Sequence, residues 1–366
     1  MPALRIAIDA RAAAEVPAGR GRYVRELLRG LARLDAEHRL LLYARTPWHD
    51  DALEADERFG WRIVSAGEPQ WSALAALRAS RESDVVLATN SYLLAALARV
   101  PAVATVFDLT PFRRDVVLPR GADFERLTLP LAVRRAAALL PISHATREDL
   151  VARFPRAAAK ATVVELAADA TFAADAPPVA ARYGLERPYV LALGTLEPRK
   201  NLPRLIEAFA ALPPALRDAH ELVLVGGSGW ATDEIDASIA AHRELVRPLG
   251  HVPDEDLPSL YRGAALFAYP SLFEGFGLPV LEAMTAGTAV LTSSTSSLPE
   301  VGGDAVRYAD PTDVAAIRDA LAALLADPGE RARLAAAGRE RARGFSWERT
   351  AQATLAALER AAAAAT

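Results

Sequence analysis

The chain has 366 residues, of which 52% are hydrophobic and 24% charged, and it carries 42 basic against 46 acidic residues. This composition excludes disordered and fibrous proteins, and the formal net charge of −4 gives no sign of a nucleic-acid-binding surface. The absence of cysteine excludes disulfide frameworks, cysteine-based metal sites and thiol nucleophiles, and it is compatible with a reducing cytoplasm.

In the first half of the chain, short apolar runs alternate with amphipathic helical patterns, which predicts a parallel sheet covered on both faces. We expect one α/β domain over residues 1–173, and no run of about 20 apolar residues that could span a membrane. Its strands are predicted at Leu4–Asp9, Leu40–Tyr43, Asp84–Ala88, Ala102–Phe107 and Ala138–Ile142, and its helices at Tyr23–Leu34, Phe124–Arg135 and Ala145–Phe154.

The small, proline-rich stretch within residues 174–187 has no periodicity and is predicted to be a linker. A second α/β domain is expected over residues 188–345, followed at residues 346–366 by a helix that either packs back on the first domain or frays. In the second domain we predict strands at Pro188–Gly194, Glu221–Gly226, Ala264–Tyr269 and Ala289–Thr292, and helices at Leu202–Leu212 and Pro279–Ala286.

Ligands of such sheets bind at the carboxyl ends of the strands, so the loops that follow them are the first candidates for a site. One loop leaves the strand ending at Tyr269, passes Gly275 and Gly277 and enters a helix, whose N-terminus can bind an anion. Glu274 and Glu282 flank this point, and carboxylates beside an anion site are expected where a ligand also offers hydroxyl groups. The alternative is that the two glutamates only cap and solubilise the helix.

Two further loops carry candidate residues. Arg199 and Lys200 follow the strand that ends at Gly194 and could neutralise a diphosphate, although two solvated cations at a loop tip are the simpler alternative. Gly19 and Gly21 follow the first strand, in a loop that does not match a dinucleotide-binding fingerprint.

Together these segments resemble the family-4 retaining glycosyltransferases of the GT-B fold. The similarity lies in the glutamates Glu274 and Glu282, separated by seven residues, in the loop Gly194–Asn201 and in a first-domain Gly-Arg-Tyr loop. Within that family, Ile8–Arg11, Gly194–Asn201 and Gly250–Val252 look like the bacterial mannosyl- and rhamnosyltransferases that build surface polysaccharides. The resemblance implies two Rossmann-like, doubly wound domains that face each other across a cleft, an acceptor domain first and a nucleotide-sugar donor domain second.

The resemblance also implies a role for each motif residue. Glu282 would hold the ribose hydroxyls and Glu274 the hydroxyls of the donor sugar, while Arg199 and Lys200 would stabilise the charge that builds on the diphosphate. The other contacts with the nucleotide sugar would come from Gly19, Gly21, His251, Val252, Gly275, Phe276, Gly277 and Leu278.

The chain departs from the family pattern at two positions. Thr195 stands where much of the family has arginine, which shifts the phosphate-binding cation to Arg199. Phe107 stands where relatives often have histidine, so the adjacent Asp108 becomes the polar candidate nearest the reacting centre, with a helix-capping role as the alternative.

The resemblance implies transfer of a hexose, mannose or a deoxyhexose such as rhamnose, from a GDP-linked donor to a polysaccharide or lipid-linked oligosaccharide. No metal or other cofactor is expected, and the enzyme would lie in the cytoplasm with peripheral contact at the inner face of the membrane. Two alternatives remain open, a nucleotide-sugar 2-epimerase of the same fold and a catalytically silent nucleotide-sugar binder.

Overall fold

The chain folds into two units, each built on a parallel sheet of six strands. The computed structural model describes residues 2–16, 19–113, 117–118, 121–175 and 177–365. Unit 1 holds the described residues of 2–113 and 121–166 together with those from Ser346 onward, and unit 2 holds residues 117–118 and the described residues of Ala167–Phe345.

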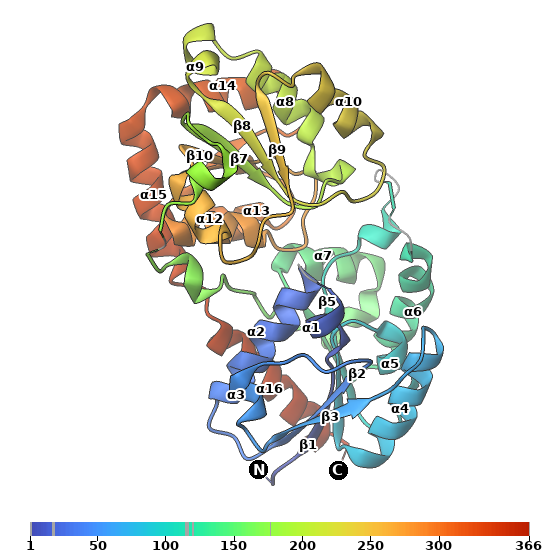
Figure 1. Ribbon diagram of the computed structural model, residues 1–366. Helices are drawn as coiled ribbons and strands as arrows, with labels where there is room; N and C mark the ends of the chain where they lie inside the picture. Colours follow the sequence, from blue (N-terminus) through green and yellow to red (C-terminus); the bar gives the residue numbers. More distant parts are fainter. Residues whose placement is uncertain (1, 17–18, 114–116, 119–120, 176, 366) are drawn as a thin grey trace. The chain divides into compact units, whose positions relative to one another are not determined.

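Unit 1 has the strand order β3-β2-β1-β4-β5-β6, and all neighbouring strands run parallel (Figure 1). Its strands are β1 (Arg5–Asp9), β2 (Arg39–Ala44), β3 (Phe59–Ile63), β4 (Val85–Ala88), β5 (Ala102–Val106) and β6 (Ala138–Pro141). Its helices are α1 (Arg11–Glu15), α2 (Arg20–Arg33), α3 (Asp51–Glu54), α4 (Gln70–Glu82), α5 (Tyr92–Leu97), α6 (Ala122–Arg135), α7 (His144–Arg153) and α16 (Trp347–Ala363).

Helices cover both faces of the unit 1 sheet, as the unbroken burial of strands such as β4 and β5 requires. Helices α4, α5 and α6 pack on one face through small and apolar side chains, Trp71, Ala75 and Leu129 among them. On the other face α16 packs against α2, where Gly30 leaves room for Ala351 and the backbone of Trp347. Thr350 of α16 also donates a hydrogen bond of 2.6 Å to the carbonyl of Glu165, so the C-terminal helix is part of unit 1.

Unit 2 has the strand order β12-β11-β10-β7-β8-β9, again entirely parallel. Its strands are β7 (Tyr189–Leu193), β8 (Glu221–Val225), β9 (Val246–Gly250), β10 (Leu266–Tyr269), β11 (Val290–Ser293) and β12 (Arg307–Ala309). Its helices are α8 (Leu202–Ala210), α9 (Pro214–Ala219), α10 (Asp233–Ala241), α11 (Leu257–Gly263), α12 (Leu278–Ala286), α13 (Leu298–Gly302), α14 (Val314–Ala326) and α15 (Pro328–Ala342).

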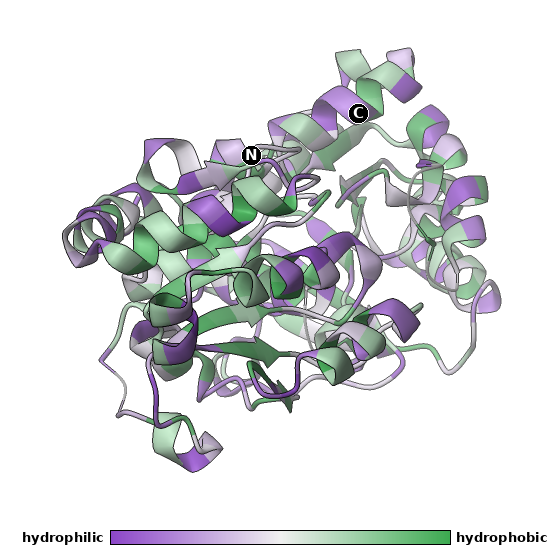
Figure 2. Cartoon of the chain, turned by 90° about the horizontal axis from the view of Figure 1, so that it is seen from above, coloured by the Kyte–Doolittle hydropathy of each residue, from purple (hydrophilic) through white to green (hydrophobic). Residues whose placement is uncertain are grey.

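The core of unit 2 lies on both sides of its sheet. Leu205 and Phe209 of α8 and Ile317 of α14 pack with sheet residues on one face, while Met284 of α12 packs against Gly338 of α15. Figure 2 shows the corresponding pattern of hydropathy: the strands are coloured as hydrophobic, and the helices alternate between the two colours. Each helix therefore turns one apolar stripe toward its sheet.

The predicted linker is packed against unit 2. Tyr183 and Arg182 both donate to the carboxylate of Asp256, and the backbone N–H of Val179 donates to Ser259 at 3.1 Å. Proline and small residues gave this segment the composition of a free connection, but Arg182 and Tyr183 are bonded to the residue before α11, and Val179 and Leu185 are buried. The division between the units falls at Leu166, and the expected boundary at residue 173 is displaced accordingly.

The strand order gives each sheet one switch point, where successive connections change direction. In unit 2 the chain moves from β7 to β8 and β9 and later returns beside β7 with β10, so the crevice lies between β7 and β10. In unit 1 the equivalent crevice lies between β1 and β4. Ligands of open α/β sheets bind outside the carboxyl ends of the strands at such points.

Candidate functional site

The loops after β7 and β10 meet at the switch point of unit 2. The first loop closes into a tight 3-10 turn at Pro198–Lys200, in which the backbone N–H of Lys200 donates to the carbonyl of Glu197 at 3.0 Å. The N–H of Leu272 in the second loop donates to the carbonyl of Arg199 at 2.8 Å, which fixes the two loops to each other.

A buried carboxylate, Glu274, joins the side chains of both loops. Its Oε1 accepts hydrogen bonds from Nζ of Lys200 at 2.7 Å and from the hydroxyl of Tyr269 at 2.8 Å. Its Oε2 accepts from Arg199, whose guanidinium also donates to the carbonyl of Phe273 at 3.3 Å. The structure therefore brings Arg199, Lys200 and Glu274 together, as their position at one sheet edge predicted.

The charges in this cluster are close enough to set one another's protonation. Burial alone would raise the pKa of Glu274, but Arg199 and Lys200 outweigh it and lower that pKa to about 2. Burial and the adjacent Arg199 lower the pKa of Lys200, against the opposite effect of Glu274 and Glu197. Glu274 is thus ionised near neutral pH and holds the two cations of the cluster.

The loop that leads into α12 is held in place by two serines. Ser297 donates to the carbonyls of Glu274 at 2.9 Å and Phe276 at 2.8 Å, and Ser296 accepts from the N–H of Glu274 at 2.9 Å. Gly277 caps α12 with φ +107°, and a Cβ there would lie 2.8 Å from Leu298, so glycine is required. Phe276 is buried.

These contacts orient the start of α12, a helix of nine residues that begins at Leu278, directly after the loop holding Gly275. The N-terminus of such a helix carries a partial positive charge and attracts an anion. Ser296 and Ser297 were not singled out from the sequence, because only the fold shows that the loop after β11 returns to this position.

Glu282 lies one turn into α12 and is almost completely buried, with 1% of its surface exposed. Its Oε2 accepts a hydrogen bond of 3.0 Å from the hydroxyl of Tyr261 on α11. The carboxylate is therefore held by a partner of its own, apart from the contacts that join Glu274 to Lys200 and Tyr269. It does not solubilise the helix, which was the simpler alternative.

His251 and Val252 follow β9, which is the edge strand two places from β7 in the sheet. Val252 is buried and His251 is exposed. His251 and Val252 lie at the same carboxyl edge of the sheet as the Glu274 cluster, separated from it by the loop after β8. That loop is joined to the end of β9 by a hydrogen bond of 2.8 Å, which the N–H of Gly226 donates to the carbonyl of Gly250.

The expected Gly-Arg-Tyr loop of the first domain is not a loop: the segment that begins at Gly21 lies inside helix α2. Gly19 caps α2 with φ +51°, and Gly21 is already helical, because α2 begins at Arg20. A Cβ on Gly21 would lie 1.7 Å from the carbonyl oxygen of Val16. The packing of α2 against the preceding turn therefore requires glycine at position 21, whatever else that residue does.

Asp108 lies just before a short helical turn. Its Oδ1 accepts from the N–H of Thr110 at 2.8 Å, and a 3-10 helix follows at Thr110–Phe112. The N-cap residue of this turn is Leu109, so Asp108 is bonded to the turn from one position before the cap, which differs from the capping role that the sequence left open. Phe107 packs edge to face on Tyr23, with ring centroids 5.2 Å apart.

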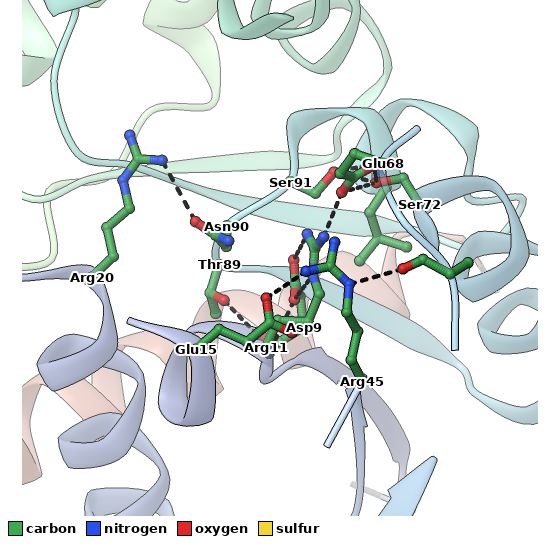
Figure 3. Close-up of polar contacts among 12 residues, drawn as sticks. Asp9, Arg11, Glu15, Arg20, Arg45, Glu68, Ser72, Thr89, Asn90 and Ser91 are labelled. Carbon is green, nitrogen blue, oxygen red and sulfur yellow. Dashed lines mark hydrogen bonds and ion pairs between the residues drawn. The ribbon is translucent and has the colours of Figure 1, made fainter. Parts of the chain in front are cut away.

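A second polar cluster occupies the switch point of unit 1 (Figure 3). Arg11 donates to both oxygens of the fully buried Asp9 at 3.0 Å and to Glu68 at 2.5 Å, and it lies 3.6 Å above the ring of Trp71. Ser72 donates to Glu68 at 2.7 Å. The sequence pointed to Asp9 and Arg11 only through the resemblance, since Glu68 lies in a loop 57 residues away from Arg11.

Beside this cluster, a second cation lies at the start of α2. Arg20 donates to Glu125 of α6 at 2.7 Å and to Asn90 after β4 at 3.5 Å. Glu125 and Asn90 thus add two polar side chains to this cluster. Arg11 and Arg20 each have a carboxylate partner. The carboxyl edge of the unit 1 sheet can therefore accept hydrogen bonds from the hydroxyls of a ligand while the charges of these two arginines stay paired.

Two family descriptions match the chain. Residues 17–172 match the family described as "Glycosyltransferase Family 4", and residues 181–341 match "Glycosyl transferases group 1". The two matches fall mainly on unit 1 and unit 2 respectively. Among the described residues, no helix is both long and apolar enough to cross a membrane.

Characterised relatives and solved structures agree with these matches. O-antigen chain mannosyltransferase B of Escherichia coli is 37% identical over 278 residues, which is 74% of this chain and 72% of that relative. The Anabaena protein HepE in complex with UDP-glucose has a TM-score of 0.79 at 19% identity, over 98% of this chain and all of the other. Sucrose-phosphate synthase from Thermosynechococcus elongatus has a TM-score of 0.78 at 22% identity, over 99% of this chain and all of the other. At such identities the structures show the fold alone.

Proposed function

Because this chain belongs to glycosyltransferase family 4, has the GT-B fold and resembles bacterial mannosyltransferases of surface polysaccharide synthesis, we propose that it transfers mannose from GDP-mannose with retention of configuration. The acceptor in this proposal is a polysaccharide or a lipid-linked oligosaccharide. Mannose is favoured by the mannosyltransferase of Escherichia coli, 37% identical to this chain. The GDP-linked donor is inferred from the same resemblance.

The observation that carries the proposal is the cluster of Arg199, Lys200 and Glu274 at the switch point of unit 2, beside the N-terminus of α12. When the bond between the sugar and the pyrophosphate breaks, the pyrophosphate leaves with the electron pair and gains negative charge. Two cations and a helix N-terminus stabilise that charge more strongly in the transition state than in the bound donor.

In this arrangement the acceptor hydroxyl forms the new bond to the sugar carbon on the face that the pyrophosphate leaves, and its proton passes to a phosphate oxygen. Glu274 accepts hydroxyls of the donor sugar, and Glu282 accepts the ribose hydroxyls in place of the Tyr261 contact. Backbone groups from Gly275 to Leu278 face the phosphate and sugar, and those at His251 and Val252 face the base. The cations that this mechanism uses are side chains, so we propose that transfer needs no metal ion.

Unit 1 is the proposed acceptor domain. Its switch point carries the paired cluster of Asp9, Arg11 and Glu68, with Asn90 and Asp108 at the same sheet edge. Carboxylate and amide oxygens suit the hydroxyl groups of a glycan terminus.

A transfer assay with purified enzyme and a mannan-type oligosaccharide tests the function. With GDP-mannose we expect a mannosylated product whose new linkage is α, formed also in the presence of EDTA, and much slower transfer from UDP-glucose, ADP-glucose or GDP-rhamnose. Conversion of the donor without an acceptor, with the nucleotide still attached, would favour the epimerase. Tight nucleotide binding without turnover of any donor would favour the silent binder.

We further propose that the enzyme works in the cytoplasm and contacts the inner face of the membrane through the outer surface of α4, α5 and α6. On this surface, the leucine–arginine face, the exposed acidic side chains among the described residues are Asp123 of α6 and Glu82 at the end of α4, which is paired with Arg62. The exposed apolar and basic side chains of the face are Leu74, Leu77, Leu97, Leu127 and Leu131, together with Arg78, Arg81, Arg99, Arg126, Arg134 and Arg135. Exposed apolar groups among arginines are suited to an anionic lipid surface.

Reversal of two charges on this face is expected to weaken membrane binding. Each basic residue near an anionic leaflet contributes about 1 kcal/mol, so Arg134→Glu combined with Arg135→Glu should reduce binding to phosphatidylglycerol vesicles by more than about tenfold in a flotation assay. The control is Arg243→Glu with Arg343→Glu, since both arginines are exposed in unit 2. Equal binding of the two double variants would rule out the leucine–arginine face.

A further inference from the structure

Glu197 is a buried acid in the candidate donor site to which neither the motifs nor the proposed function assigns a role. It ends the segment after β7 and precedes the turn that carries Arg199 and Lys200, and 2% of its surface is exposed. Its Oε1 lies 2.5 Å from Nε of Arg199 and 4.0 Å from Nζ of Lys200. The contact with Nε is poorly directed, and among the described residues this oxygen accepts no hydrogen bond of good geometry.

A carboxylate at this position is costly unless it has a use. Glu197 and Glu274 together balance the charges of Arg199 and Lys200, and so they reduce the positive potential that a pyrophosphate would meet. Burial of a charged group is unfavourable in itself, and here an oxygen lacks a well-made hydrogen bond. Glu274 already contacts both cations, and Glu197 adds a further contact to Arg199.

The two carboxylates meet the guanidinium of Arg199 on different nitrogens. The guanidinium is a rigid planar fork, with Glu197 against Nε and Glu274 against Nη1. Glu274 and the carbonyl of Phe273 both contact Nη1, and Glu197 adds a contact on a second nitrogen, which restrains the plane of the fork. A group that stabilises a transition state needs its position held to within about 0.5 Å.

We propose that Glu197 is a positioning residue, which acts through Nε of Arg199 to hold the guanidinium in the plane that meets the donor pyrophosphate. The inference rests on the proposed function, because it assumes that Arg199 contacts that pyrophosphate. Glu197 itself does not touch the donor.

The proposal has a consequence for the pH dependence of turnover. Burial raises the pKa of Glu197 and Glu274 adds to the rise, against Arg199 and Lys200, which lower it. The other groups that face it do not titrate in mild acid, because the pKa of Glu274 is about 2 and that of Tyr269 lies well above its usual value. As pH falls, Glu197 is thus the member of the cluster that takes up a proton first, and Arg199 then loses its second restraint.

The test measures kcat and the donor KM of the full-length enzyme as a function of pH, for Glu197→Gln in the wild-type and Arg199→Lys backgrounds. Lysine has no counterpart of Nε. In the wild-type background, Glu197→Gln should lower kcat about tenfold, change the donor KM little and flatten the fall of kcat in acid. In the Arg199→Lys background, the same substitution should change kcat less than about twofold, because the coupled group is absent.

The control is Glu340→Gln, which removes an exposed carboxylate paired with Arg343 and should leave both parameters and the pH profile unchanged. An equal loss of kcat in both backgrounds, or an unchanged acid limb in Glu197→Gln, would overturn the proposal. If Glu197→Gln does not fold, Arg199→Lys alone tests the inference. Its kcat should not fall in acid as that of the wild-type enzyme does, and a fall of kcat in acid that persists in Arg199→Lys would contradict the inference. Failure of the proposed function would appear differently, as no transfer by the unaltered enzyme.

Discussion

Replacement of Lys200 by methionine is expected to lower kcat for mannosyl transfer by about 10²–10³, with a much smaller change in donor KM. Nζ of Lys200 is buried among Glu274, Tyr269 and Arg199, in a place where water screens charge poorly. Methionine keeps the length and apolar stem of the side chain, so the substitution removes the cation and little else. Steady-state kinetics with GDP-mannose provide the measurement.

The chain offers a matched control, because its sequence contains only two lysines, Lys160 and Lys200. Lys160 lies in unit 1, where its Nζ donates to the carbonyl of Ala136 at 2.5 Å. Lys160→Met should leave kcat within about twofold of the wild-type value, since it alters neither switch point. A loss of kcat in Lys200→Met no larger than that in Lys160→Met would remove Lys200 from the proposed mechanism.

Replacement of Arg11 by methionine is expected to lower the free energy of unfolding by about 3–5 kcal/mol, the usual cost of leaving a buried charge without its partner. Asp9 is fully buried, and Arg11 donates to both of its oxygens. The same guanidinium also holds Glu68 and lies over the ring of Trp71. Urea denaturation compares the variant with the wild-type protein.

The double variant with Asp9→Asn and Arg11→Met should recover a large part of the loss, because no uncompensated charge then remains on Asp9. The control is Arg5→Met, whose ion pair with Asp84 leaves 53% and 35% of the two side chains exposed. Surface pairs of this kind contribute little. If Arg11→Met and Arg5→Met shift the denaturation midpoint equally, the buried cluster does not stabilise unit 1 in the way described.

Buried central strands were predictable from the sequence, and edge strands were not. The run at β4 is apolar throughout and buried on both faces, so its pattern is unambiguous. Strand β3 is half-exposed along its length, and β9 contains Pro248, which argues against a strand except at a sheet edge. Helix α4 escaped notice because its buried face is largely alanine, which contrasts weakly with the polar face.

The charged members of the donor site were predictable because they follow strands of one parallel sheet, whose carboxyl ends share an edge. The sequence did not predict a role for Glu197, Tyr269 or the two serines after β11. Their roles follow from the atoms that they contact in the folded protein, and no sequence pattern shows those contacts. The lysine count offered a signal: in a chain that otherwise uses arginine, a lysine in a strand-to-helix loop indicates a need for a compact cation. For Arg11 and Glu68 no local pattern exists, because the loop contact forms only on folding.

In the proposed mechanism, the loops after β7 and β10 hold a nucleotide diphosphate. A crystal structure of the full-length protein with GDP measures this directly. We predict pyrophosphate oxygens within hydrogen-bonding distance of both Arg199 and Lys200, at the start of α12, with the ribose hydroxyls on Glu282. GDP bound elsewhere on the protein, with the ion pairs of Glu274 unchanged and no phosphate beside them, would contradict it.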